Sequence, residues 1–99
     1  FHDGIDISNK VGTSILAYAN GTVTKTAWTD SYGNYIVIDH GGGLETYYIH
    51  LSGFDVSVGD SVSGGQLIGR MGKTGSATGS HLQFEVRVNG SPVNPWDYI

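Results

Sequence analysis

The chain has 99 residues, a length typical of one domain, with 16 glycines, only two prolines and no cysteine. Charged residues make up 14% and hydrophobic residues 38%, which argues against a disordered segment, and the scarcity of proline excludes collagen and proline-rich linkers. The formal net charge of −4 argues against a nucleic-acid or anionic-membrane partner, and no apolar run approaches the roughly 18 residues of a membrane span.

The first half of the chain predicts two β-hairpins. Residues 13–29 alternate in strand fashion around Asn20-Gly21, a dipeptide typical of tight hairpins. A second pair of strand-like segments, 34–40 and 44–51, flanks three consecutive glycines at 41–43. We therefore expect one hairpin around Asn20-Gly21 and another closed by the triglycine turn.

The second half continues in short strands. Strand-like segments at 56–62 and 66–72 are followed by a loop of small residues at 74–80 and by a strand at 81–88. Asn89-Gly90 then turns the chain towards its tail. No stretch repeats apolar residues with the period of a helix. The sequence therefore predicts a single all-β domain over residues 1–99, a small antiparallel sheet or sandwich with essentially no helix.

Candidate chemistry lies with the histidines and their strand neighbours. In an extended segment, positions i, i+2 and i+4 share one face. Three pairs meet this condition: His2 with Asp6, Tyr48 with His50, and His81 with Gln83. Imidazole and carboxylate are ordinary zinc ligands, and a chain without cysteine can hold a metal only with nitrogen and oxygen atoms. Each pair alone is weak, because a strand histidine is more often a hydrogen-bonded surface residue.

Seven motifs follow one another along nearly the whole chain. They are His2-x-Gly4-x-Asp6, Tyr48-x-His50-Leu51, Val58-Gly59-Asp60-Ser61-Val62, Gly65-Gln66-Leu67-Ile68-Gly69, Gly72-x-Thr74-Gly75, Thr78-Gly79-Ser80-His81-Leu82-Gln83-Phe84-Glu85 and Pro92-Val93-Asn94-Pro95. In residues and in order, this set resembles the lysostaphin-type zinc endopeptidases, which cut bacterial peptidoglycan. The resemblance implies a small antiparallel fold of the duplicated-hybrid-motif kind, with a groove across a sheet and zinc on the groove floor.

The resemblance also implies a role for each site residue. His2 and Asp6 fall on two zinc-ligand positions of the family. His50 and His81 fall on the two histidines that do not bind zinc but orient the attacking water and stabilise the oxyanion. The third ligand of the family is the second histidine of a His-x-His pair, and this chain has Gln83 at that position. A minor departure is Ser80, where the family usually has proline.

Gln83 leaves three interpretations open. A neutral amide oxygen is a weaker partner for Zn²⁺ than an imidazole nitrogen, so we expect weaker zinc retention. The glutamine is an introduced change that silences an active enzyme, the mark of a natural pseudo-peptidase, or a metal ligand in a weakened but working site. Persistence of the other four site residues favours the first or the third. Glu85, two residues further on, can reach the surroundings of the site, although a simple structural role is its default.

The resemblance implies a metal-dependent endopeptidase that hydrolyses peptide bonds in peptidoglycan cross-bridges or stems, with Zn²⁺ as its cofactor. The alternative is an inactive pseudo-peptidase that binds peptidoglycan or another protein. We expect a location outside the cytoplasm, in the cell wall, in the periplasm, as a secreted protein or in a phage particle. We also expect this domain to be excised from a longer protein with flanking domains. Neither nucleic-acid binding nor membrane insertion is expected.

One rival class shares part of the pattern. The segments 58–62 and 65–66 also look like the half-barrel turns of biotinyl and lipoyl carrier domains. Such carriers present a modifiable lysine at a hairpin tip, usually beside acidic or methionine residues. Lys10, Lys25 and Lys73 lack that setting. The carrier interpretation also leaves the histidines without a role, so the peptidase interpretation is preferred.

Overall fold

The computed structural model describes residues 4–77 and 79–99, and within them the chain folds almost entirely as β-strands. The elements are β1 (Gly4–Ser8), β2 (Ser14–Leu16), β3 (Gly21–Thr29), β4 (Gly33–Asp39), β5 (Leu44–Phe54), β6 (Ser61–Val62), β7 (Leu67–Met71), β8 (His81–Val88), β9 (Ser91–Val93) and the short 3₁₀ helix η1 (Pro95–Asp97). No helix in this part of the chain is long and apolar enough to cross a membrane. The predicted all-β fold is confirmed.

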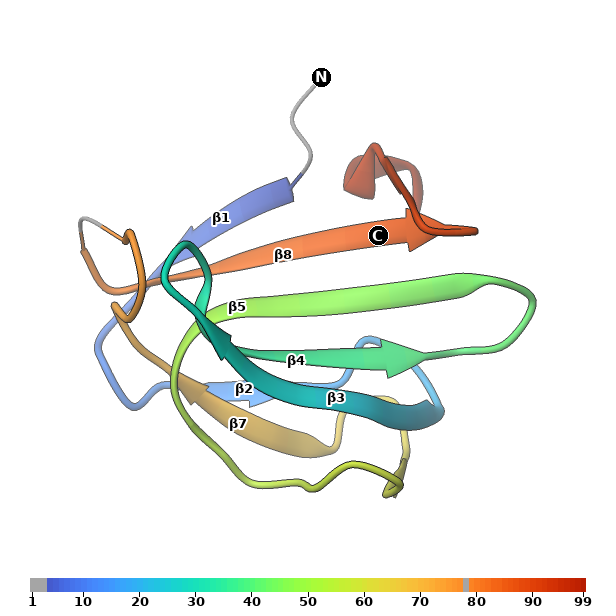
Figure 1. Ribbon diagram of the computed structural model, residues 1–99, viewed down its shortest axis with the longest axis horizontal. Coiled ribbons are helices and arrows are strands. Elements are labelled where there is room, and N and C mark those ends of the chain that lie inside the picture. The colour runs from blue at the N-terminus through green and yellow to red at the C-terminus, as the bar shows by residue number, and fades with distance from the viewer. Residues whose placement is uncertain (1–3, 78) are drawn as a thin grey trace.

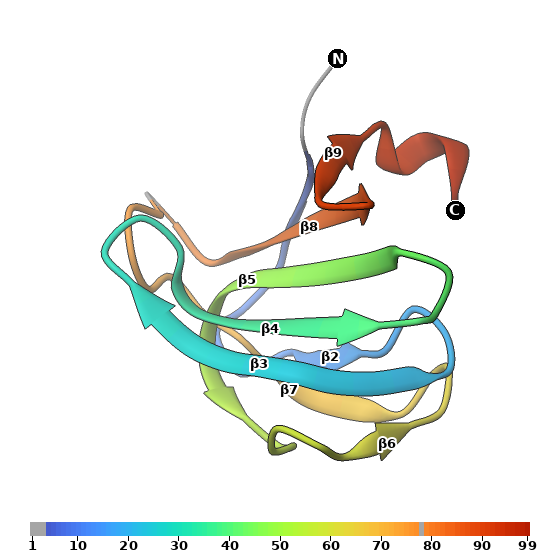
Figure 2. The same ribbon diagram turned by 45° about the vertical axis from the view of Figure 1, so that its right-hand side comes forward.

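The strands form one antiparallel sheet in the order β1-β8-β5-β4-β3-β6. Figure 1 shows β8, β5, β4 and β3 side by side, with β2 and β7 running together near them. β7 pairs with the far end of β5, and β2 pairs with β7. β9 pairs with β8 and leads into η1; Figure 2 shows both on the side of β8 away from β5. The long strand β5 therefore joins the main sheet to the β2–β7 pair.

The main hydrophobic core lies between the sheet and the β2–β7 pair. Ile15 of β2 and Ile68 of β7 pack there with Ile36 of β4, Tyr48 of β5 and Phe84 of β8. Tyr48 is fixed further by two hydrogen bonds: its hydroxyl lies 2.7 Å from Thr46 Oγ1 and accepts one from the backbone N–H of Tyr18. Burial raises the pKa of Tyr48, which these hydrogen bonds partly oppose.

A second, smaller cluster occupies the opposite face of the sheet. Its buried members are Tyr35 and Val37 of β4 and Ile49 of β5, and they alternate along their strands with residues of the main core. Tyr47 and Tyr32 pack against this cluster from the sides. Because β2 and β7 cover the other face, this second face is the one on which polar residues of β1, β5 and β8 can form a site.

The hairpin predicted around Asn20-Gly21 is wrong. β2 pairs with β7 through Ile15 and Gly69, while β3 pairs with β4 and β6. Asn20 instead acts in a connection, where its side-chain oxygen accepts a hydrogen bond from the backbone of Gly64. The buried side chains of Ile15 and Ile68 close the core only when β2 meets β7, so burial of apolar surface outweighs the local turn preference.

The second predicted hairpin and the final turn are confirmed. β4 and β5 pair across the triglycine turn, with Asp39 opposite Glu45. Asn89-Gly90 joins β8 to β9, and both residues have positive φ angles, as a two-residue hairpin turn requires. These local signals succeed because the strands that they join are neighbours both in sequence and in the sheet.

The loop before β8 is anchored to the start of β4 at Thr74. Its hydroxyl donates to the carbonyl oxygen of Leu51 at 2.6 Å and accepts from the backbone N–H of Asn34 at 3.2 Å. Gly33 makes this approach possible, because a side chain there would overlap the backbone of Thr74. Gly33 also has φ +64°, a conformation that favours glycine.

We predict that Gly33→Ala destabilises the domain more than Gly42→Ala. Gly42 has a similar φ of +62°, but nothing lies within 4 Å of the place that its Cβ would take. Gly42→Ala should therefore cost only the conformational penalty, about 1–2 kcal/mol. Gly33→Ala should lose about 1–3 kcal/mol more through overpacking against Thr74. Urea unfolding of both variants measures the difference, and equal losses would show that the close approach has no energetic weight.

Candidate metal and catalytic site

Two predicted metal-ligand positions face each other across the β1–β8 pairing. Asp6 of β1 lies directly opposite Gln83 of β8. Directly opposed residues of an antiparallel pair share a face, with their Cβ atoms about 5 Å apart. The Asp6 side chain is 71% exposed, so its carboxylate is open to a ligand. His2, the other predicted ligand, lies outside the described residues.

Both predicted catalytic histidines lie beside this pair. His81 comes two residues before Gln83 on β8, and its Nε2 lies 4.0 Å from an Asp6 carboxylate oxygen. The rings of His50 and His81 are neighbours, with centroids 4.8 Å apart. The structure thus brings Asp6, His50, His81 and Gln83 together from three strands that are far apart in sequence.

The prediction that Tyr48 and His50 share a face is wrong. Tyr48 packs in the main core against Phe84, whereas His50 meets His81 on the opposite face. The alternation of β5 breaks at His50, whose φ of +71° lies in the left-handed region. The register with neighbouring strands also shifts on either side of this position. The irregular backbone therefore turns the imidazole of His50 into the site.

Backbone carbonyls hold both rings in the same tautomer. Nδ1 of His50 lies 2.7 Å from the carbonyl oxygen of Thr74, and Nδ1 of His81 lies 3.0 Å from that of Gly79. A carbonyl oxygen only accepts, so in both rings Nδ1 carries the hydrogen. A neutral ring then offers Nε2 as a hydrogen-bond acceptor. The loop of small residues, which supplies both carbonyls, thus presets the histidines for work as bases at Nε2.

A chain of charged and polar side chains supports Gln83 along β8. Gln83 Nε2 donates to Glu85 Oε2 at 2.6 Å, and Arg87 Nη2 donates to Glu85 Oε1 at 2.9 Å. Alternation along the strand places all three on one face. Glu85 is only 3% exposed, so its charge depends on these two partners.

Arg87 closes this chain on an aromatic surface. Its Nη2 also donates to the Tyr32 hydroxyl at 2.9 Å, and its guanidinium carbon lies 4.1 Å from the centre of the Tyr47 ring. Burial is the largest single influence and lowers the pKa of Arg87. The hydrogen bond to Glu85, together with electrostatic attraction to Tyr47, Tyr32 and Glu85, outweighs burial and raises the pKa above its usual value. For Tyr47 the effect of burial has the opposite sign: burial raises its pKa, and the nearby positive charge of Arg87 partly opposes this rise.

The glycine of the His2-x-Gly4-x-Asp6 motif has a steric role. Gly4 lies opposite Glu85 in the β1–β8 pairing. A Cβ at Gly4 would lie 3.0 Å from Glu85 Cγ, 3.2 Å from Gln83 Cγ and 2.9 Å from the backbone oxygen of Phe84. The missing side chain leaves the space in which Gln83 and Glu85 meet.

The donor set fits a divalent cation held by oxygen and nitrogen. Asp6 supplies a carboxylate, Gln83 supplies an amide oxygen, and Nε2 of His81 is a further acceptor nearby. Such a concentration of acceptors favours a cation between them. Within residues 4–77 and 79–99, no three His, Asp or Glu side chains lie in an arrangement that could by themselves hold a metal ion. This agrees with the sequence, because one predicted position is Gln83 and another is His2.

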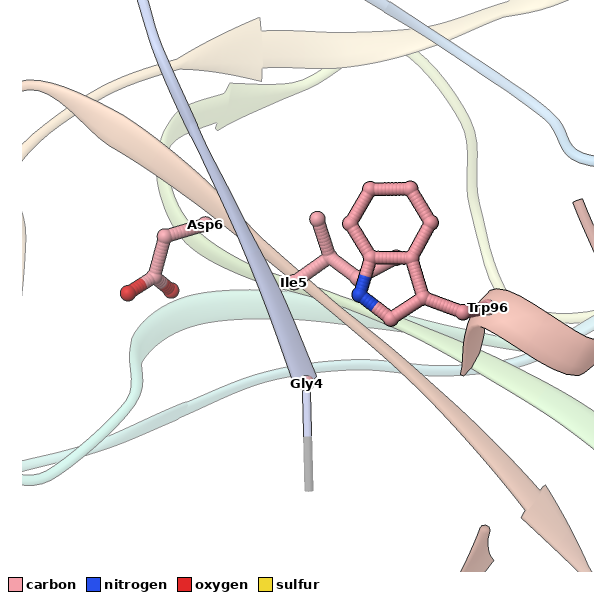
Figure 3. A pocket seen from close by; sticks show the side chains of 4 residues that line it. All are labelled: Gly4, Ile5, Asp6 and Trp96. Atoms are coloured by element: carbon pink, nitrogen blue, oxygen red, sulfur yellow. The ribbon is translucent and has the colours of Figure 1, made fainter. Parts of the chain in front are cut away.

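A shallow hollow of about 270 Å³ lies beside β1 and is lined by Gly4, Ile5, Asp6 and Trp96. Figure 3 shows the Trp96 indole and Ile5 on one side of the β1 ribbon and the Asp6 carboxylate on the other. Trp96 comes from η1 and is 66% exposed. The hollow therefore borders the candidate site without including His50 or His81.

Comparison with known proteins agrees with these motifs and this fold. The model of peptidase family M23 matches residues 1–95. The chain belongs to peptidase family M23. It superposes on the catalytic domain of the antimicrobial peptidase lysostaphin from Staphylococcus simulans with a TM-score of 0.93, at 34% identity, over 99% of this chain and 78% of that one. A zinc-containing peptidase from Vibrio cholerae matches with a TM-score of 0.90 and 38% identity, over 93% of this chain and 28% of that one.

Two curated relatives are bacterial peptidases. The DD-carboxypeptidase/endopeptidase Mpg of Neisseria meningitidis is 47% identical over 94 residues, which are 95% of this chain and 22% of the relative. The peptidoglycan DD-endopeptidase ShyA of Vibrio cholerae is 44% identical over 93 residues, which are 94% of this chain and 22% of the relative. The chain thus spans about a fifth of the length of these relatives.

Sequence reasoning located the histidines but missed part of their support. Glu85 could be found by strand alternation from Gln83, and the same alternation points to Arg87. Tyr32 and Thr74 gave no local signal, since they reach the site from loops that only the tertiary fold brings close. The carrier-domain alternative fails at this point, because the M23 match covers residues 1–95.

We predict that Arg87→Met lowers the free energy of unfolding by about 3 kcal/mol, because it leaves the buried Glu85 carboxylate without its charged partner. Arg70→Met is the matched control. Arg70 pairs with Asp55 at 3.2 Å, but these side chains are 44% and 37% exposed, so that change should cost about 1 kcal/mol or less. Urea unfolding at neutral pH compares the two variants. Similar losses would show that the Glu85–Arg87 pair behaves as an ordinary surface contact.

Proposed function

We propose that this chain is the metal-dependent peptidase domain of a peptidoglycan hydrolase, which cleaves peptide bonds in the cross-bridges or stems of the bacterial cell wall. One observation carries the proposal: Asp6 and Gln83 face each other directly, and His50 and His81 lie beside them with Nδ1 directed at backbone carbonyls, so that Nε2 is the proton-accepting nitrogen. Zinc is the proposed metal, held by Asp6, Gln83 and His2. The peptide of peptidoglycan is the proposed substrate.

The bound metal would supply Lewis-acid chemistry, polarising the scissile carbonyl and making a water molecule more acidic. The chain's own residues do the rest. One of His50 and His81 accepts the proton of the attacking water at Nε2 and passes it to the leaving amine. The other takes a proton from solvent at Nε2 and donates a hydrogen bond to the developing oxyanion. The carbonyls of Thr74 and Gly79 keep both rings oriented for these roles. The 4.8 Å between ring centroids lets both histidines act on the same reacting carbonyl.

Gln83 also supports a second candidate function. An amide oxygen holds zinc less firmly than the imidazole expected at this position. A domain with weak metal retention that keeps the fold fits a pseudo-peptidase, which binds peptidoglycan or a partner protein without cutting it. The two candidates share the fold and differ in metal binding and turnover, so one set of measurements separates them.

We further propose that the parent protein works outside the cytoplasm and carries flanking domains. Support comes from the relatives: ShyA is a peptidoglycan DD-endopeptidase, and this chain covers only 22% of the length of ShyA and of Mpg. Peptidoglycan lies outside the cytoplasmic membrane, so a hydrolase of this substrate has to reach that compartment. A particle that delivers the domain from outside the cell, such as a phage, would meet the same requirement.

We predict that Gln83→His raises zinc affinity by at least about 10- to 100-fold and raises the rate of peptide release from purified peptidoglycan. Calorimetric zinc titration and amine release measure the two quantities. The control is His81→Gln in the Gln83→His background, which should retain zinc and lose turnover, since it removes a proposed catalytic ring without removing a proposed ligand.

Each result discriminates between the candidates. Cleavage by the unaltered chain would exclude the pseudo-peptidase. Cleavage by Gln83→His alone would support an enzyme framework that Gln83 has silenced. If Gln83→His binds zinc no better than the unaltered chain and releases no peptide, the endopeptidase proposal is wrong.

A further inference from the structure

We propose that Glu85, held in place by Arg87, is a positioning residue that fixes the amide of Gln83 with its oxygen towards Asp6 and His81, so that Gln83 serves as an oxygen ligand to the metal. This inference rests on the metal site of the proposed function. Gln83 stands where the resemblance implies histidine, and the contacts of its side chain define which amide atom can face a metal.

The NH₂ group of the Gln83 amide, rather than its oxygen, faces Glu85. A carboxylate accepts hydrogen bonds and has none to donate when ionised. Glu85 Oε2 lies 2.6 Å from the Gln83 amide, so the NH₂ group must be the one that faces it. The amide oxygen diverges from the same carbon and therefore faces away from Glu85. Among the described residues, no donor pairs with this oxygen.

The Glu85 side chain is held in place by its own partner and by burial. Its other oxygen accepts from Arg87 at 2.9 Å, and its side chain is only 4% exposed. Arg87 is held in turn by the Tyr32 hydroxyl and the face of Tyr47. Gly4 lies opposite Glu85 in the β1–β8 pairing, and the absence of a side chain there leaves the space that Glu85 occupies. The carboxylate is therefore paired on both oxygens and fixed in direction.

His81 and Asp6 lie on the side of Gln83 away from Glu85. Along β8, Glu85 is two residues to one side of Gln83 and His81 is two residues to the other. Asp6 lies directly across the strand pair and within 4.0 Å of the His81 ring. An oxygen turned away from Glu85 thus faces the side on which the other acceptors gather. A flipped amide would present NH₂ to a cation and would oppose binding.

An isosteric change tests this chain of contacts. In Glu85→Gln, the new side chain can donate as well as accept, so the direction of the Gln83 amide is no longer enforced. We expect the zinc dissociation constant to rise about 10- to 100-fold, the usual effect of removing a group that orients a ligand. The matched control is Glu45→Gln. Glu45 lies opposite Arg87 on β5 and loses the same charge, but within the described residues it makes no hydrogen bond to Gln83.

A metal-free measurement on the unaltered chain stands beside it. The sequence has two glutamines, Gln66 and Gln83, and Gln66 uses its oxygen to accept from the backbone of Ser63. Nitrogen-15 NMR of the side-chain amides should show one Gln83 proton shifted downfield and exchanging slowly, with a scalar coupling across the bond to the Glu85 carboxyl carbon. In Glu85→Gln, this signal should move while that of Gln66 stays. The NMR result needs neither metal nor activity.

The outcomes separate this inference from the proposed function. Loss of zinc affinity in Glu85→Gln but not in Glu45→Gln, together with the coupled Gln83 signal, supports the positioning role. If Glu85→Gln binds zinc as the unaltered chain does, or if the Gln83 amide exchanges like a free one, the inference is overturned and the metal site stands. If zinc binds to Gln83→His but not to the unaltered chain, Gln83 is no ligand and the inference is again overturned. If neither binds zinc, the proposed function fails as well.

Discussion

The antiparallel register between β1 and β8 is the constraint on which the site depends. It places Asp6 opposite Gln83 and Gly4 opposite Glu85, so one pairing provides both the candidate ligands and the space for their support. A slip by one residue would turn Asp6 to the other face, towards the core. The register is fixed by alternation, since Ile5 and Phe84 must enter the core while their neighbours face outwards.

How far the sequence predicts this protein depends on the range of each interaction. Alternation and glycine turns identified the strands and the β4–β5 hairpin, because these signals act between neighbours in the chain. They failed for β2, whose partner β7 is chosen by burial of Ile15 and Ile68 across about fifty residues. The roles predicted for Asp6, His50, His81 and Gln83 come from motif resemblance, and the fold brings these four residues together. Alternation placed Tyr48 and His50 on the same face, which is wrong, because no local sequence signal predicts a positive φ at His50.

The site combines a rigid half and an open half. Glu85 and Arg87 are tied to each other and to Tyr32, and His50 is 4% exposed. Asp6, by contrast, is largely exposed on the edge strand β1. His50, a proposed acid–base group, is thus fixed within the sheet, while Asp6, a proposed metal ligand, is accessible from solvent. Such pre-organisation on strands, with access from one side, suits chemistry on an extended substrate.

The left-handed backbone of His50 bears on how any knock-out at this position is interpreted. Outside glycine, asparagine is among the residues that tolerate φ near +71° best, whereas alanine meets a steric penalty there. Replacement by alanine would therefore remove the imidazole and strain β5 at the same time, and lost activity would have two causes. Replacement by asparagine removes the imidazole and still allows the left-handed backbone conformation at this position. The conformation of a single residue thus decides which substitution isolates chemistry from folding.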